Sequence, residues 1–243
     1  MKKILIAILV LVILWVAWYF TYEKYLKNFW REDEIWPIVE WFLKSKNVKD
    51  FIKYNFDNSL KDSLWNSKII PWDNFQTQFW KDENWTFWQW STQNTRWGWF
   101  FVDIPEKLEK NYIIVLKFSP EETEPNRKKI IDYKNKQSDN WLYFYWGRVQ
   151  FFPDLTLWKS IFKNNELLTF VIDSSEDWKL TIYNLKDNIM EKELEIPLDT
   201  EKEVQSFLPN WKAILWFFVD DVMSTLENWI KWGKVYSLQI YNK

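Results

Sequence analysis

The residues that best fit a binding chemistry are acidic and amide side chains in two predicted turns. Asp220 and Asp221 are followed after five residues by Glu227, and Asp62 precedes Asn66 near the start of the domain. Oxygen atoms of this kind are the ligands that Ca²⁺ prefers, so each group is a candidate calcium site. The alternative is that these oxygens accept backbone N–H groups and stabilise their own turns. Calcium is therefore the one cofactor that the sequence suggests.

Several other chemistries are excluded by composition. The chain has no cysteine and no histidine, so it lacks disulfides, thiol nucleophiles, imidazole bases and the usual zinc ligands. Its 32 basic and 34 acidic residues are interspersed and give a net charge of −2. This balance indicates neither a nucleic-acid partner nor attraction to an anionic membrane surface.

Tryptophan and glycine are used in reversed proportion. The 243 residues include 21 tryptophans and only 3 glycines, whereas glycine is normally about 7% of a protein. Six of the tryptophans stand second in dipeptides where glycine is the usual turn residue. These dipeptides are Pro71-Trp72, Asn84-Trp85, Asn140-Trp141, Asp177-Trp178, Asn210-Trp211 and Asn228-Trp229.

This pattern leads to the hypothesis that most or all of the tryptophans are glycines, encoded by UGA in an organism that reads UGA as glycine. Glycine would then account for 3 + 21 = 24 of the 243 residues, an ordinary content for a loop-rich β protein. The rival interpretation is a tryptophan-rich surface that stacks on sugars. Such a surface would gather its indoles on one platform, whereas these are spread through turns.

The amino-terminal residues indicate membrane targeting. Lys2 and Lys3 precede an uncharged apolar run from Ile4 to Phe20. We expect residues 1–21 to form a signal-anchor helix with a cytoplasmic amino terminus, which places the rest of the chain outside the cytoplasm. The alternative is a cleaved signal peptide and a secreted domain. It follows if Trp15 and Trp18 are glycines, because the purely apolar stretch then shortens.

Residues 22–48 are expected to be a helical stalk. They are charged, with Ile38, Val39, Phe42 and Leu43 at helical spacing, and Pro37 suits a first turn. A partner-binding helix is the alternative.

From residue 49 the pattern changes to short apolar and aromatic runs separated by turns. We expect strands at 51–56, 100–104, 112–118, 129–133, 142–145, 148–152, 167–173, 179–185, 213–219 and 234–241. Runs at this spacing without helical segments between them predict an antiparallel sandwich over 49–243. Strand 112–118 alternates, which predicts one buried and one wet face, and the polar segments 120–128 and 186–206 are expected to be loops.

Four segments resemble bacterial laminin-G-like domains of the concanavalin A-like superfamily. They are "FIKYNFDNSLKDSLWNS" at 51–67, "RKKIIDYKNKQSDNWLYFYWGRVQFF" at 127–152, "LLTFVIDSSEDWKLTIYN" at 167–184 and "AILWFFVDDVMSTLENWIKWGKVYSLQIYN" at 213–242. In the first three segments, Trp65, Trp141, Trp146 and Trp178 stand where that family has glycine. The resemblance implies a jelly roll of two packed antiparallel sheets, and calcium in a ligand loop as in many relatives.

The resemblance also bears on catalysis. Glucanases of this fold carry Glu-x-Asp-x-x-Glu on one strand, and this chain lacks that motif. Glu191, Glu193 and Glu195 alternate on a segment that could be a strand, but no Asp lies between them, and a solvated edge explains them. We therefore expect a protein that is not an enzyme.

Two functions of different classes remain. The first is a membrane-anchored lectin or adhesion module that recognises a carbohydrate or a cell-surface component. The second is a structural envelope protein that packs against other proteins. A glycoside hydrolase is a lesser alternative.

Overall fold

The structure is a computed structural model. It describes residues 15, 37–54, 68–71, 79–81, 86–89, 100–104, 111–121, 123, 128–132, 141–152, 159–175, 179–187, 189–197, 213–218 and 233–243. Fourteen strands account for most of them. The strands are β1 (Lys49–Tyr54), β2 (Lys68–Pro71), β3 (Phe79–Lys81), β4 (Thr86–Gln89), β5 (Phe100–Ile104), β6 (Tyr112–Pro120), β7 (Lys128–Asp132), β8 (Trp141–Tyr145), β9 (Arg148–Phe152), β10 (Leu168–Ser175), β11 (Lys179–Lys186), β12 (Ile189–Pro197), β13 (Ala213–Phe217) and β14 (Gly233–Asn242).

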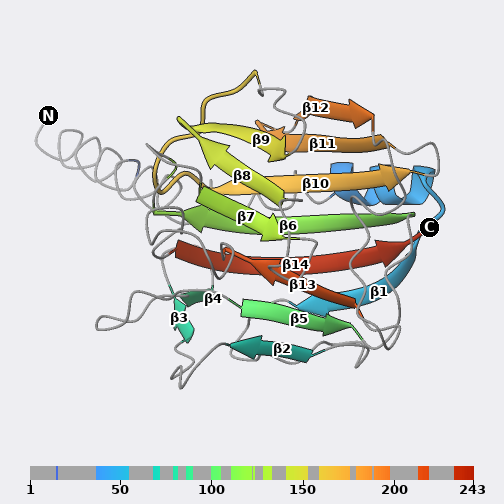
Figure 1. The fold of residues 1–243 in the computed structure, drawn as a ribbon, viewed down its shortest axis with the longest axis horizontal. Coiled ribbons are helices and arrows are strands. Elements are labelled where there is room, and N and C mark those ends of the chain that lie inside the picture. The colour runs from blue at the N-terminus through green and yellow to red at the C-terminus, as the bar shows by residue number, and fades with distance from the viewer. Residues whose placement is uncertain are drawn as a thin grey trace, which may run out of the picture.

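The strands form two sheets, and one sheet lies in front of the other in Figure 1. The eight-stranded sheet has the order β12-β11-β10-β6-β14-β4-β3, with β1 also paired to β14. The six-stranded sheet has the order β2-β5-β13-β7-β8-β9. Every pairing between these strands is antiparallel. The predicted all-β antiparallel sandwich is confirmed.

The main hydrophobic core lies between the sheets. It takes alternate residues from each strand, since side chains of a strand point to opposite faces in turn. The eight-stranded sheet contributes Ile114, Leu116, Phe118, Phe170, Ile172, Leu238 and Ile240, and the six-stranded sheet contributes Val102, Leu142, Phe144, Val149, Phe151, Leu215 and Phe217. Phe118 packs edge-on against Phe170 at 5.3 Å between ring centroids, within the preferred range for aromatic pairs.

All ten strands predicted from the sequence are present, but four further strands were not predicted. Three of them, β2, β3 and β4, are only three or four residues long. The fourth, β12, corrects the expectation of a loop across 186–206. It lies at the end of the eight-stranded sheet and buries Leu194 and Ile196 while exposing charged side chains. Charge on an edge strand opposes pairing with other chains, and here it made the strand look like a loop.

Residues 37–45 are helical and pack on the outer face of β6, β10, β11 and β14. Asn47, with φ of 52°, follows the last turn of the helix. A second cluster of buried residues joins the helix to the sheet: Val39, Phe42 and Leu43 from the helix, with Ile113, Val115, Val171, Leu185 and Tyr241 from the strands. The expectation that one face of β6 is wet was therefore wrong, because the helix covers that face.

No helix in the described part of the chain is both long and apolar enough to cross a membrane. Apart from Trp15, the predicted anchor at 1–21 lies outside that part.

Candidate functional site

The calcium candidates from the sequence lie outside the described residues. This holds for Asp220, Asp221 and Glu227 and equally for Asp62 and Asn66. The described residues contain no cluster of three acidic side chains able to hold a metal ion. The nearest described residue to Asp220 is Phe218. Phe218 is buried, its φ is 62°, and its N–H donates to the carbonyl of Ile130 at 3.1 Å.

The best described candidate for a binding surface is one end of the sandwich, which we call the tip. We define the tip as the β8–β9 turn (145–148), the segment 159–167 and Thr123. The turn is a two-residue hairpin, because Tyr145 pairs with Arg148 across it. Its central residues, Trp146 and Gly147, have φ of 52° and 68°.

Backbone hydrogen bonds brace the tip. The N–H of Gly147 donates to the carbonyl of Thr123 at 3.1 Å, and the Gly147 carbonyl accepts from the N–H of Phe162 at 2.7 Å. The Asn164 amide oxygen accepts from both the N–H and the hydroxyl of Thr123, at 2.8 and 3.0 Å. Three segments far apart in sequence are thus held in one fixed arrangement.

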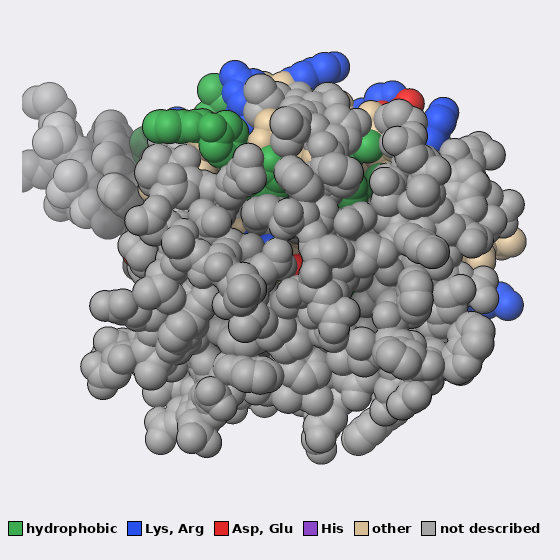
Figure 2. All heavy atoms as spheres, viewed as in Figure 1, with side chains coloured by type: hydrophobic (Ala, Val, Ile, Leu, Met, Phe, Trp, Pro, Cys, Tyr) green, Lys and Arg blue, Asp and Glu red, His purple; other side chains and the backbone are tan. Residues whose placement is uncertain are grey.

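The tip exposes both apolar and cationic side chains. Of the large apolar side chains that are exposed in the described residues, four lie here: Tyr145 (37%), Trp146 (56%), Ile161 (59%) and Leu167 (43%). Lys159 and Lys163 are exposed, and Arg148 Nη1 donates to the carbonyl of Lys159 at 3.0 Å. Hydrophobic and cationic side chains also gather along the upper edge of the molecule in Figure 2.

Only part of the tip is predictable from the sequence. The strands that flank the β8–β9 turn are predicted, but Tyr145, Ile161 and Leu167 are not marked as exposed. No signal in the sequence marks Ile161 or Leu167 as exposed, because their exposure depends on how 159–167 is held against the turn.

A row of buried polar side chains lies on the outer face of the six-stranded sheet. Lys129, Tyr143 and Gln150 are neighbours across β7, β8 and β9. Lys129 Nζ lies 2.8 Å from Asp132 Oδ2, with both side chains fully buried, and the Tyr143 hydroxyl donates to Gln150 Oε1 at 2.7 Å. Tyr143 faces away from the core, because it alternates along β8 with Leu142 and Phe144, which belong to the core.

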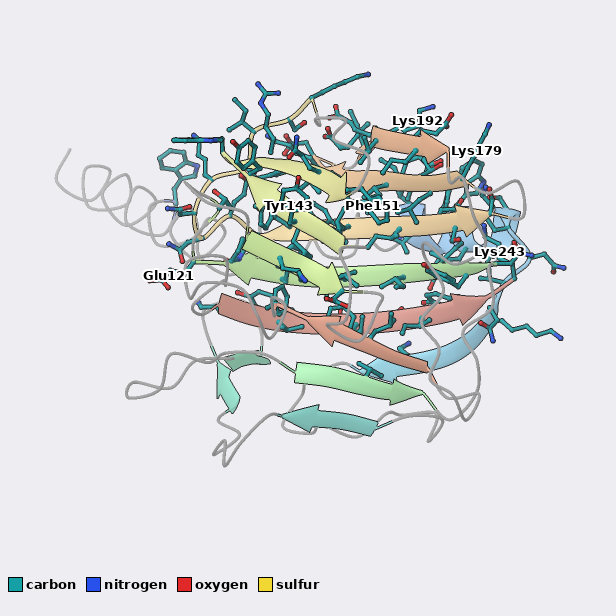
Figure 3. All side chains as sticks on the ribbon, viewed as in Figure 1. Glu121, Tyr143, Phe151, Lys179, Lys192 and Lys243 are labelled. Carbon is teal, nitrogen blue, oxygen red and sulfur yellow. The ribbon has the colours of Figure 1, made fainter. Side chains whose placement is uncertain are left out.

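At the end of the sandwich opposite the tip, Asp173 joins the helix to the end of β14. Its buried carboxylate lies 3.0 Å from Lys46 Nζ and also pairs with Lys243. Figure 3 shows Lys243 at this end and Glu121 at the other. Burial raises the pKa of the nearby Tyr183 phenol, and the Asp173 carboxylate raises it further.

The three alternating glutamates do not form one row. A bulge in the β11–β12 pairing leaves Glu193 without a cross-strand partner. Its carboxylate is buried and accepts from the hydroxyl and the N–H of Ser160, at 2.5 and 3.3 Å. Glu191 and Glu195 are exposed, and a hydrogen bond from Lys192 lowers the pKa of Glu195. The arrangement ties segment 159–167 to β12 rather than presenting paired carboxylates.

Comparison with known proteins finds similarity at the level of fold. No family model matches the chain, and no curated protein matches it. Solved structures do match. The binding domain of botulinum neurotoxin serotype D has a TM-score of 0.54 and 14% identity, over 80% of this chain and 48% of that one.

Two further structures are similar. Botulinum neurotoxin type C, which depends on interaction with two ganglioside molecules to enter cells, gives a TM-score of 0.57 at 11% identity, over 81% of this chain and 48% of that one. The carbohydrate esterase vb_24B_21 of the Shiga toxin-encoding bacteriophage phi24B gives 0.51 at 9% identity, over 81% of this chain and 99% of that one. The chain spans about half the length of the neurotoxin structures. What these proteins and this chain share is the β-sandwich fold.

Proposed function

We propose that the chain is an extracytoplasmic binding module, anchored to the membrane by residues 1–21, that recognises a carbohydrate or a cell-surface component. The observation that carries this proposal is the tip, where a braced turn and segment expose an aromatic ring, aliphatic side chains and cations together. Exposed apolar side chains that lie together on a protein surface often mark the place where a ligand or another protein binds.

The chemistry of the tip suits a sugar ligand. Tyr145 offers a partly exposed ring on which a pyranose can stack, and its hydroxyl can hydrogen-bond. The exposed Lys159 and Lys163 offer donors to hydroxyl or carboxylate oxygens. The proposal assigns no contact to Trp146, because the sequence leads us to expect glycine there.

The similar structures support a binding role by analogy. Two of them are neurotoxin binding structures, one of a toxin that interacts with gangliosides. One fold can carry many different functions. The analogy therefore supports the class of function, and the ligand has to be identified by experiment. The finer form of the proposal is a concanavalin A-like, laminin-G-like jelly roll without enzymatic activity, with calcium held by Asp220, Asp221 and Glu227.

The second candidate is a structural envelope protein that packs against other proteins. Ile161 and Leu167 favour it, since exposed aliphatic side chains contribute more to protein interfaces than to sugar binding. Oligomers of the purified chain that dissociate on Ile161→Asp would support this candidate.

The test is binding of the detergent-solubilised full chain to a glycan panel that includes neutral and sialylated sugars. We expect at least one class of glycan to bind, and Tyr145→Ala to weaken that binding by about tenfold or more, as for an aromatic anchor. Lys179→Ala is the matched control, because Lys179 is exposed at the start of β11, away from the tip. The carbohydrate form of the proposal fails if no glycan binds, and the assignment to the tip fails if Tyr145→Ala binds as the unmodified chain does.

A further inference from the structure

We infer that position 146 carries glycine in the protein that the cell makes, its codon being read there as glycine and not as tryptophan. The inference goes beyond the proposed function and does not depend on it. It rests on the backbone conformation at 146, and the burial of the chain's aromatic residues supports it.

The backbone at 146 is the conformation that glycine favours. A two-residue hairpin with positive φ at both central residues is a type I′ turn, in which Asn-Gly and Gly-Gly are preferred. Trp146 and Gly147 have this conformation, with φ of 52° and 68°. A residue with a Cβ atom is disfavoured in the left-handed region because that atom crowds the neighbouring carbonyl oxygen.

The other residues with positive φ have an explanation that Trp146 lacks. Asn47, Asn165 and Asp187 are of the two residue types that tolerate this region best. Phe218 is buried against Phe118 and makes a backbone hydrogen bond, so packing compensates for its conformation. Trp146 is 56% exposed, and its one ring contact within the described residues is with its neighbour Tyr145.

Tryptophan also fails to behave as a core residue elsewhere in the described chain. Tryptophan is usually among the most buried side chains on average, together with the other large apolar residues. Three tryptophans have a described exposure. Trp15 lies in the predicted anchor, and the other two, Trp41 and Trp146, are 71% and 56% exposed. Phenylalanine and tyrosine fill the core instead, and no tryptophan is among the buried residues that the structure describes.

The backbone conformation at Trp41 does not favour glycine. Trp41 lies in the helix at 37–45, where glycine is less favourable than alanine. Its exposure agrees with recoding, but its helical conformation does not ask for glycine. The two positions therefore make opposite predictions for the same substitution and serve as controls for each other.

Glycine at 146 changes the chemistry of the tip. Two consecutive glycines at 146 and 147 leave the turn without a side chain, so a ligand can approach its backbone N–H and C=O groups closely. Tyr145 is then the one aromatic side chain of the turn, which agrees with its role in the proposed function.

The direct test is mass spectrometry of the native protein, purified from its own cells, on the peptide that contains 141–148. We expect the residue mass of glycine at 146 and a UGA codon at that position in the gene. A peptide that carries tryptophan at 146 overturns the inference.

The preference of position 146 for glycine can be tested separately in a recombinant host, with all tryptophan codons written as UGG. We expect Trp146→Gly to melt about 2–4 °C above Trp146→Ala, because only glycine relieves the left-handed conformation. At position 41 the order should reverse, with Trp41→Ala melting above Trp41→Gly. Equal melting temperatures for the two variants at 146 would contradict the turn argument. Because these readouts are mass and stability, a negative glycan panel leaves them unaffected.

Discussion

At the scale of single residues, the least expected feature is charge buried on the outer face of the six-stranded sheet. The side chains of Lys129 and Asp132 are both fully buried and lie 2.8 Å apart. Removing two charges from water costs several kcal/mol per ion, and their attraction recovers this only when the geometry is good. Such a pair is weak evidence for stability, and it makes the site sensitive to loss of one partner.

A single and a double variant separate the stability lost when one partner is removed from the contribution of the whole pair. Lys129→Met should destabilise the protein by about 3–5 kcal/mol, because it removes the ammonium group that lies 2.8 Å from the buried Asp132 carboxylate. The double variant Lys129→Met with Asp132→Leu should recover most of that loss. Urea unfolding of the two variants measures both values.

The control for this experiment is the exposed pair of Lys192 and Glu195, whose atoms are 3.0 Å apart. Lys192→Met should change stability by less than about 1 kcal/mol, since exposed pairs contribute little. A double variant no more stable than Lys129→Met would show that the polar pair itself is needed at this face.

At the scale of elements, the helix at 37–45 is part of the sandwich. Val39 is fully buried and Phe42 nearly so, and the Phe42 ring meets the Tyr183 ring edge-on at 5.3 Å between centroids. The ion pair between Lys46 and Asp173 holds the end of the helix to β10. The helix therefore covers the outer face of the central strands, and a ligand cannot use that part of the sheet while the helix is in place.

Phe42→Ala tests how strongly the helix is attached. We expect a loss of about 3–5 kcal/mol in the free energy of unfolding, from lost burial and the cavity left behind. Glu40→Ala is the matched control on the exposed side of the same helix, and it should be nearly neutral. The measurement is the same urea titration, joined by hydrogen exchange of β6 and β10. Unchanged stability in Phe42→Ala would mean that the helix is only loosely associated.

At the scale of the whole molecule, the sandwich has two distinct ends. One carries the tip, and the other carries the contacts of Asp173 with Lys46 and Lys243. Turns that close one end of a rigid sandwich can vary without disturbing the sheets, which is why binding residues commonly lie there.

Calcium provides a prediction for the intact chain. If Asp220, Asp221 and Glu227 hold the ion, saturating Ca²⁺ at about 100 times its dissociation constant should stabilise the protein by about 2.7 kcal/mol. Chelation should reverse the shift, and Asp220→Asn with Asp221→Asn should abolish it. A response that survives in that variant but is lost in Asp62→Asn would assign the ion to the other candidate turn. A melting temperature indifferent to calcium and chelator would leave both turns as self-capped loops.

The class of fold and the places of ten strands can be predicted from the amino-acid pattern alone. Strands such as 112–118 and 179–185 carry dense β-branched and aromatic residues, and this local pattern is enough to identify them. The helical conformation of residues 37–45 also follows from the sequence, because apolar residues are spaced along one face. The placement of tryptophan directly after Asn, Asp or Pro is likewise visible in the sequence, without any knowledge of conformation.

Which faces and side chains are exposed depends on how the strands and the helix pack together. The outer face of β6 was expected to be wet, but a helix distant in sequence covers it. The strand β12 was taken for a loop because its charged residues reflect its place at the sheet edge, a property of the assembled sheet. Glu193 is turned to Ser160 by a bulge, and the tip exists because hydrogen bonds hold 159–167 against the β8–β9 turn. Each of these depends on contacts between segments far apart in the chain, which no local pattern records.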